Sequence, residues 1–368
     1  MKYLRFILLY VVSFFIRPFF KIDKKLLLFG VRGGTGFDDN TKYLFLYGSN
    51  YKDYNCVWIS KDKNIIKRIR KMGYKSEYYF SLNALKLGLK ANAIFITHSL
   101  SDVMPIFYNK KTQVYNLYHG IPMKKIEFLD KNIPLRGRLM NHWKSKRTTY
   151  FATNSSYYTE IYKKSFRLPS NKILKSGYPR MEFLIDPDKF KVKLENPFKL
   201  GESFLYLPTF RDYESHIILE DGLLNKINQI MKDNNSNFYI KLHPFEKRKI
   251  DVSHYSNIFL LSNKHNTQEI LPFADVLITD YSSVVFDFLI FDKPVIFYCH
   301  DLDKYLETRG FLIDFEGLFK TNIAKNPEEF ILKLQTYKEQ VIPENIKNKI
   351  VEFDMDNCSE VIFNSIKN

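Results

Sequence analysis

Two consecutive serines, Ser282 and Ser283, have a setting that is typical of an anion-binding site. They follow the apolar, strand-like run 276–279 and precede the apolar run 284–291, which is typical of a short helix. Such a junction offers free backbone N–H groups and the positive end of a helix dipole. It is also where parallel α/β sheets bind ligands. The segment predicts a phosphate site, although plain helix capping would also explain two serines.

Two carboxylates flank this pair. Asp280 either meets the ligand or orients the turn by accepting backbone N–H bonds. Asp287 lies four residues after Ser283, on the same helix face, within an apolar run. Because a buried, unpaired carboxylate is costly, Asp287 needs a hydrogen-bond donor, which a substrate hydroxyl or a protein group could supply.

Further polar residues follow apolar runs in the same half of the chain. Thr209 and Arg211 come after the run 203–207, and His243 comes after the run 238–242. A guanidinium group matches the geometry of phosphate, and an imidazole N–H suits a diphosphate. Taken singly, Arg211 and His243 are better explained as a surface arginine and a structural histidine.

His119 is the best candidate for a general base. It ends the apolar run 113–118, and an imidazole is the usual proton acceptor near neutral pH. Lys124 and Lys125 add positive charge that would assist an acceptor or a phosphate. His98 ends a neighbouring run and is a weaker candidate.

Strand and helix patterns alternate from about residue 24 onward, which predicts an α/β fold with parallel sheets. The length of 368 residues favours two domains, and the polar stretch 186–200 with its two prolines reads as the linker. We expect Rossmann-like domains over 23–190 and 191–368, with the last helix over 343–366. If the two sheets face each other, all the candidate residues converge on one cleft.

Residues 1–22 require a separate interpretation. The segment 3–20 is apolar except for a few polar positions, including Arg5 and Arg17, and its uncharged part is shorter than the roughly 20 residues that span a bilayer. On a helix, the cationic residues share one side, which predicts a helix lying in the membrane interface. A buried helix of the first domain is the alternative. A cleaved signal peptide fits poorly, because Pro18 and its bulky neighbours do not form a small-residue cleavage site.

The net charge of +16 points to an anionic partner, such as a lipid surface, a phosphate-bearing substrate or nucleic acid, although a lysine-rich proteome would also produce it.

Three scattered cysteines without a CxxC pattern indicate neither a disulfide framework nor a zinc site, and favour a reducing, cytoplasmic setting. The chain lacks a P-loop, GxSxG, HExxH and a paired-acid metal motif. Phosphoryl transfer would therefore use cationic side chains and helix dipoles, without a metal.

Several segments together resemble the CDP-glycerol glycerophosphotransferase family, the polymerases and primases of teichoic acid synthesis. They occur in the family's order, and are DDNTKYLFLY (38–47), YHGIPMKK (118–125), SGYPRMEFL (176–184), LYLPTFRD (205–212), KLHP (241–244), LITDYSSVVFDFLIFDKPVIFY (277–298) and DLDKYLETRGFLIDF (301–315). The size is closer to primase-type or capsule-associated members than to the large polymerases.

The resemblance implies a two-domain, glycosyltransferase-B-like fold and a metal-independent, cofactor-free transferase. The donor would be CDP-glycerol or CDP-ribitol, CMP would be released, and the acceptor would be a polyprenyl-diphosphate-linked hydroxyl at the cytoplasmic face of the membrane. By resemblance His119 is the base, and the donor is met by the segments that carry His243, Thr209, Arg211, Asp280, Ser282, Ser283 and Asp287. Ile121 and the stretch 316–319 depart from the family pattern, which leaves the polyol open.

Two other functions remain as alternatives. A nucleotide-sugar glycosyltransferase for a cell-surface polysaccharide would have the same architecture and a different donor. A basic, non-catalytic nucleic-acid binder would explain the charge, but it would leave the histidines and serines at the strand ends unexplained.

Overall fold

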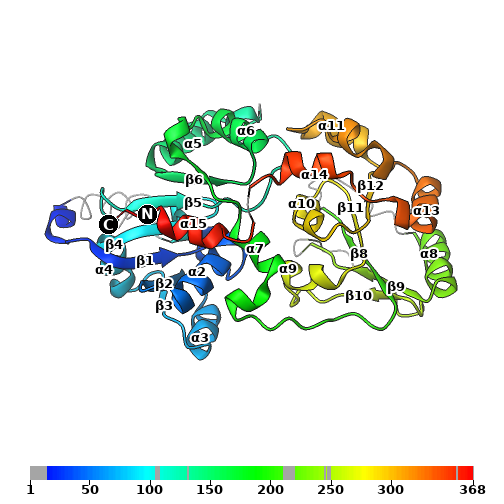
Figure 1. The fold of residues 1–368 in the computed structure, drawn as a ribbon, viewed down its shortest axis with the longest axis horizontal. Coiled ribbons are helices and arrows are strands. Elements are labelled where there is room, and N and C mark those ends of the chain that lie inside the picture. Colours follow the sequence, from blue (N-terminus) through cyan, green and yellow to red (C-terminus); the bar gives the residue numbers. More distant parts are fainter. Residues whose placement is uncertain are drawn as a thin grey trace. The chain divides into compact units, whose positions relative to one another are not determined.

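A computed structural model describes residues 15–103, 108–130, 132–209, 220–243, 246, 250–353 and 355–367. These residues form two compact units (Figure 1). Unit 1 comprises the described residues of 15–119, 127–192 and 352–367, and unit 2 comprises those of 120–126 and 193–351. Most of the predicted membrane-interface helix, and also Arg211, lie outside the described residues.

The units differ from the predicted domains, 23–190 and 191–368, in two segments. Residues 120–126 belong to unit 2, and the C-terminal residues from 352 onward return to unit 1. The predicted helix over 343–366 is two helices, α14 (Glu344–Ile350) and α15 (Cys358–Asn364), separated by a polar stretch. Because α15 packs against α2 and α7 of unit 1, the chain must leave its helical path to reach them (Figure 1).

Unit 1 is built on a seven-stranded parallel sheet in the order β3-β2-β1-β4-β5-β6-β7. Its central strands are apolar and buried, as expected when helices cover both faces of a parallel sheet. Its strands are β1 (Asp23–Phe29), β2 (Asn55–Ser60), β3 (Ser76–Tyr78), β4 (Ala91–Ile96), β5 (Gln113–Asn116), β6 (Tyr150–Thr153) and β7 (Ile173–Lys175).

The helices of unit 1 alternate with these strands (Figure 1). Besides α15, they are α2 (Asp39–Tyr51), α3 (Lys63–Lys71), α4 (Leu82–Lys90), α5 (Leu135–Arg147), α6 (Ser156–Phe166) and α7 (Pro179–Ile185). Short 3₁₀ segments cover Arg17–Phe19, Arg32–Gly34, Leu100–Asp102, Glu127–Leu129, Ser170–Lys172 and Pro187–Phe190.

Unit 2 has a six-stranded parallel sheet in the order β10-β9-β8-β11-β12-β13. Its strands are β8 (Glu202–Leu207), β9 (Ser236–Ile240), β10 (Ile258–Leu260), β11 (Val276–Thr279), β12 (Val295–Tyr298) and β13 (Ile323–Ala324). Its helices are α8 (Asp221–Asp233), α9 (Thr267–Ile270), α10 (Val284–Phe288), α11 (Leu302–Thr308), α12 (Phe315–Phe319), α13 (Pro327–Gln335) and α14. Short 3₁₀ segments cover Leu271–Phe273, Leu289–Phe291, Lys320–Asn322 and Tyr337–Glu339.

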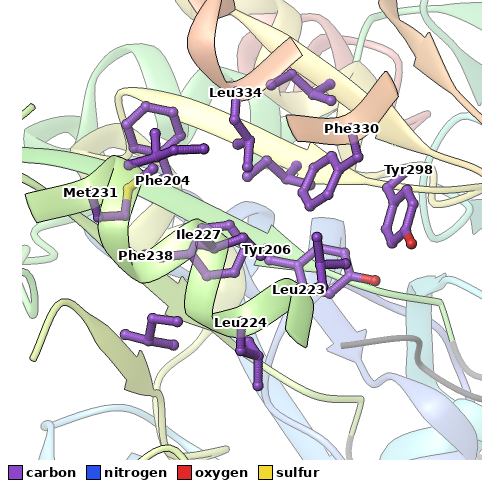
Figure 2. Packing of buried hydrophobic residues seen from close by; sticks show 14 of the residues in the cluster. Phe204, Tyr206, Leu223, Leu224, Ile227, Met231, Phe238, Tyr298, Phe330 and Leu334 are labelled. Atoms are coloured by element: carbon purple, nitrogen blue, oxygen red, sulfur yellow. The ribbon is translucent and has the colours of Figure 1, made fainter. Parts of the chain in front are cut away.

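Both sheets confirm the predicted α/β fold, and both have the doubly wound strand order, in which chain order reverses next to the first strand. In unit 2, the helices α8 and α13 pack their apolar faces on the sheet (Figure 2). There Phe204 and Tyr206 of β8 meet Ile227 and Met231 of α8, and Phe330 of α13 stacks on Tyr298. This packing fixes the strand ends that carry the candidate residues. No helix within the described part of the chain is long and apolar enough to cross a bilayer.

Candidate active site

The candidate residues fall into two groups, one at the carboxyl edge of each sheet. In unit 1, His119 follows β5 and is exposed, while Tyr118 before it is buried and has φ of +52°. This left-handed conformation is uncommon for a residue with a side chain, and the surroundings must hold it. The N–H of Tyr118 donates to Asn116 Oδ1 (2.9 Å), and its ring packs against Phe151 and Tyr162. The turn that presents His119 is therefore fixed.

A buried polar network holds the backbone of this turn from the other side. Asn40, at the start of α2, donates its amide to the carbonyl oxygens of Leu117 and Tyr118, each at 3.0 Å. Arg180 of α7 donates from Nη1 to the carbonyl of His119 (3.0 Å) and to Asp39 Oδ1 (3.2 Å). Because Arg180 and Asn40 are buried, each contact is worth more than it would be in water.

The ring of His119 is stacked on the ring of His98, with centroids 4.1 Å apart and planes 6° apart. His98 lies in the loop after β4, and Thr97 Oγ1 lies 2.8 Å from its Nδ1. The buried carboxylate of Asp102 accepts the backbone N–H groups of Thr97 (3.0 Å), His98 (2.8 Å) and Ser99 (3.3 Å). It also accepts the N–H of Gly33 (2.7 Å), which ties this loop to the loop after β1.

The surroundings keep the imidazole of His119 neutral. Crowding by protein atoms around the ring lowers its pKa, and the neighbouring His98 lowers it further. The ring is nonetheless open to solvent at its outer side, because the residue as a whole is exposed. A hydrogen bond from the ring of His119 to the backbone of Thr97 acts in the opposite direction and raises the pKa of His119, because an accepting backbone oxygen favours the protonated ring. One ring nitrogen therefore donates to Thr97, and the other is free to accept a proton from a substrate.

In unit 2, the site is centred where chain order reverses, between β8 and β11. Asp280, 2% exposed, follows β11 and accepts the N–H of Thr209 through both carboxylate oxygens, each at 3.0 Å. It also accepts the hydroxyl of Thr209 and the N–H of Tyr281 (2.6 Å). These bonds tie the ends of β8 and β11 together. They support a positioning role for Asp280.

Ser282 and Ser283 lie at the start of α10, as predicted, and both are partly buried. Ser282 Oγ accepts the N–H of Val284 (3.3 Å), while Ser283 is the residue before the helix and makes no capping bond with its side chain. Asp287 on α10 is 1% exposed, and the Gln268 amide lies 3.5 Å from its Oδ2. The Gln268 amide is therefore the protein donor near Asp287, a buried carboxylate for which the sequence predicted a hydrogen-bond partner.

The end of β9 carries His243, which is exposed, and Lys241, which is 8% exposed. Burial lowers the pKa of Lys241, and the described residues provide no acidic partner for its ammonium group. A buried cation without a counter-ion at a strand end is suited to a bound anion. Lys124 and Lys125 are exposed and lie in the segment 120–126, which pairs with residues 310–312 through Lys124–Phe311 and Met123–Leu312 (2.8 Å).

Sequence reasoning missed the residues that hold the site, namely Asn40, Asp39, Arg180, Asp102 and Lys241. The signal was present, since Asp39 and Asn40 lie in the segment 38–47, Arg180 in 176–184 and Lys241 in 241–244, all of which carried the family resemblance. Only Asp102 lies outside these segments. Within the described residues, no cluster of three or more histidine, cysteine or acidic side chains could hold a metal ion.

Comparison with known proteins gives a consistent result. The profile of the family described as CDP-glycerol:poly(glycerophosphate) glycerophosphotransferase matches residues 10–368. The teichoic acid glycerol-phosphate transferase of Staphylococcus aureus (strain NCTC 8325 / PS 47) is 27% identical over 338 residues, which cover 86% of this chain and 85% of that protein.

Two further proteins bear on length and fold. The teichoic acid poly(glycerol phosphate) polymerase of Staphylococcus epidermidis (strain ATCC 35984 / DSM 28319 / BCRC 17069 / CCUG 31568 / BM 3577 / RP62A) is 27% identical over 325 residues. This match covers 80% of the present chain, which spans only 43% of that polymerase. The solved structure of the wall teichoic acid polymerase TagF has the same fold, with a TM-score of 0.78 at 24% identity over 94% of this chain and 88% of that one.

Proposed function

The chain belongs to the CDP-glycerol:poly(glycerophosphate) glycerophosphotransferase family, and from that premise we propose that it transfers a polyol phosphate from a CDP-polyol to a hydroxyl of a polyprenyl-linked acceptor. The polyol is most simply glycerol, after the family's description, with ribitol as the variant to test. The product enters a teichoic acid or a capsular polymer. We further propose a glycosyltransferase-B-like arrangement of the two units.

The transfer replaces one phosphorus–oxygen bond by another. The acceptor hydroxyl attacks the phosphorus that bears the polyol, in line with the bond to CMP, and that bond breaks as CMP leaves. His119 takes the proton of the attacking hydroxyl. CMP departs with the negative charge, so the step needs no strong acid on the leaving side.

The observation that carries this proposal is the environment of His119. A base must be neutral at working pH and held in position. The lowered pKa of His119 supports the first condition. The hydrogen bonds from Asn40 and Arg180 to the backbone of its turn, called the clamp below, support the second. A structural histidine would need neither an exposed ring nor a strained preceding residue.

The donor diphosphate is assigned to unit 2. His243, Arg211 and Lys241 supply positive charge or N–H donors, and Ser282 and Ser283 supply hydroxyl and backbone donors. Thr209 is held beside them by Asp280. Asp287 would meet the polyol hydroxyls, while Lys124 and Lys125 would assist the acceptor phosphates. These cations are proposed to stabilise the negative charge that develops on the leaving CMP without a metal, so a chelator should leave the rate unchanged.

His119→Ala tests the assignment directly. We expect it to reduce CMP release from CDP-glycerol by about 10³-fold or more, as loss of a base does, with donor affinity nearly unchanged because the donor groups lie in unit 2. The assay uses isolated membranes as the source of acceptor, and calorimetry measures donor binding. Activity within about tenfold of wild type would exclude His119 as the base.

The alternative is a nucleotide-sugar glycosyltransferase of the same fold. It differs in its leaving group, so a donor panel that scores CMP release against UDP release separates the two. The same panel, run with CDP-glycerol and CDP-ribitol, identifies the polyol. We place the reaction at the cytoplasmic face of the membrane, where a polyprenyl-linked acceptor is available, and propose no role in nucleic-acid binding.

A further inference from the structure

The first residue after strand β2 is a half-buried lysine, Lys61. Its ammonium group lies over the ring of Tyr79, 4.3 Å from the centroid. Within the part of the chain that the structure describes, this ammonium group forms neither a hydrogen bond nor an ion pair. Burial lowers the pKa of Lys61, while the carboxylate of Asp102 acts in the opposite direction from a distance. A partly desolvated cation without a bound carboxylate is suited to an anionic ligand.

Lys61 is held against the glycine-rich loop that follows β1. Its N–H donates to the carbonyl of Gly34 (2.7 Å), and Ser60 Oγ donates to the same carbonyl (3.0 Å). Gly34 has φ of +84°, and a Cβ there would lie 3.0 Å from the Tyr79 ring and 3.4 Å from Lys61 Cγ. A glycine suits this position on both counts, since it tolerates the left-handed conformation and lets both side chains pack on the loop.

The same loop carries a second cation, Arg32. Its guanidinium group is ion-paired with Asp38 through Nη2. A Cβ at Gly36 would lie 2.7 Å from Nη2 and 2.9 Å from Nε of Arg32, so the glycine leaves room for the guanidinium group. The side chain of Arg32 is nevertheless 54% exposed, which leaves other N–H donors of the group open to solvent. Arg32 is therefore held in place and can still bind an anion.

The two cations lie on the same sheet edge as the proposed base. Lys61 follows β2, Arg32 follows β1 and His119 follows β5, and β4 lies between β1 and β5. All four strands are parallel, so their carboxyl ends share one edge of the sheet of unit 1. Since neighbouring strands are about 4.8 Å apart, the ends of β2 and β5 are about 14 Å apart. Asp102 ties the loops after β1 and β4 together by hydrogen bonds.

We propose that Arg32 and Lys61 form a phosphodiester subsite for an acceptor chain that already ends in polyol phosphate. This inference rests on the proposed function. Each transfer adds a phosphate, so an acceptor that has received a unit carries an anion a short distance behind its terminal hydroxyl. With that hydroxyl at His119, the preceding phosphates extend along the edge toward β1 and β2. The subsite therefore favours extension of a polyol-phosphate chain over the first transfer to an acceptor without polyol phosphate.

Binding to the subsite can be measured without any transfer. The probe is a short synthetic oligomer of glycerol phosphate, added to the full chain in a calorimeter in the absence of donor. We expect binding that weakens as salt is added. Lys61→Met keeps a long side chain on the Tyr79 ring and removes the charge, so binding should weaken by about tenfold or more. Lys61→Arg should retain it. Lys63→Met, which removes an exposed lysine two residues away, should bind like wild type.

Transfer assays test the same residue with the acceptor itself. With an acceptor that ends in glycerol phosphate, Lys61→Met should raise the acceptor KM by about tenfold, with the donor KM within about twofold of wild type. With a matched acceptor that lacks polyol phosphate, Lys61→Met and wild type should have the same acceptor KM. Thermal melting confirms that the variants are folded.

The subsite and the transferase reaction can fail separately. Oligomer binding that depends on Lys61, without any CMP release, would support the subsite and reject the reaction. CMP release with an acceptor KM that is unchanged in Lys61→Met would reject the subsite and keep the reaction. Two further results would overturn the subsite. One is an equal loss of oligomer binding in Lys61→Met and Lys63→Met, and the other is inorganic phosphate that binds as tightly as the oligomer.

Discussion

The imidazole rings of His98 and His119 lie parallel, with their centroids 4.1 Å apart, at the ends of two adjacent strands of unit 1. The imidazole of His98 lowers the pKa of His119, because positive charge on both rings at this distance is unfavourable. His98 is thereby a positioning residue that both supports the ring of His119 and helps to keep it neutral.

His98→Ala should therefore change the pH profile of transfer. The pKa of His119 is lowered by burial and by His98, so the neutral form persists below the usual pKa of histidine. Removing His98 raises that pKa, and the loss of kcat/KM on acidification should begin at higher pH than in wild type. Because the pKa of His119 is lowered to about 3, steady-state rates from pH 8 down to about pH 3 measure this. His254→Ala, in unit 2, is the control, and an unchanged acid limb in His98→Ala would contradict the interpretation.

The clamp on the His119 turn gives a second prediction. Asn40→Asp keeps the shape of the side chain but replaces the donor to the Leu117 and Tyr118 carbonyls by an acceptor. Since a small displacement of a catalytic group costs up to about 10²-fold, we expect kcat to fall by about 10- to 100-fold with donor KM within about twofold. A higher donor KM with unchanged kcat would show that the clamp serves donor binding instead.

Lys241 gives a prediction on the donor side. Lys241→Met keeps a long side chain at a buried position and removes the charge, so donor affinity should fall by about tenfold or more, as for loss of a hydrogen bond to a charged group. Because burial lowers the pKa of Lys241, wild-type donor affinity should also weaken at a pH below the usual range for lysine. Calorimetry with CDP-glycerol from pH 7 to 10 tests both points. Lys226→Met, an exposed lysine on α8, should bind like wild type.

The attachment of α15 to unit 1 can be tested with two helical glycines. A Cβ at Gly48 of α2 would lie 2.2 Å from the Phe363 ring of α15, so Gly48→Ala must displace that ring from its contact with α2. We expect a loss of about 1–3 kcal/mol in the free energy of unfolding. A Cβ at Gly222 of α8 meets nothing within 4 Å, so Gly222→Ala should gain about 0.5 kcal/mol. Urea unfolding measures both, and equal effects would mean that α15 is loosely held.

Much of the fold could be read from the sequence, because its strands are short apolar runs that end in chemistry-bearing residues. The runs before His119, Thr209 and Ser282 are strands β5, β8 and β11, and Ser282–Ser283 starts a helix as expected. The α/β class and the family followed from these points. The strand β3 and helix α5 were not predicted, the latter because its exposed face is the apolar one, which reverses the usual pattern.

The support of the site could not be read in the same way. Asn40 reaches the His119 turn across more than seventy residues of sequence, and Arg180 does so from the other direction. Such contacts depend on three-dimensional packing, which the hydrophobic periodicity of the sequence and the spacing of its motifs do not reveal. The same holds for residues 120–126, whose assignment to unit 2 follows from their pairing with 310–312.

Unit 1 is completed only by residues from the C-terminal end of the chain, since α15 packs against α2 and α7. On the ribosome, the face of α2 around Gly48 must therefore stay uncovered until the whole of unit 2 has been synthesised. In a nascent chain arrested before residue 352, unit 2 would be complete, but unit 1 would lack α15 and would expose an apolar face of α2. We expect chaperones to bind this species.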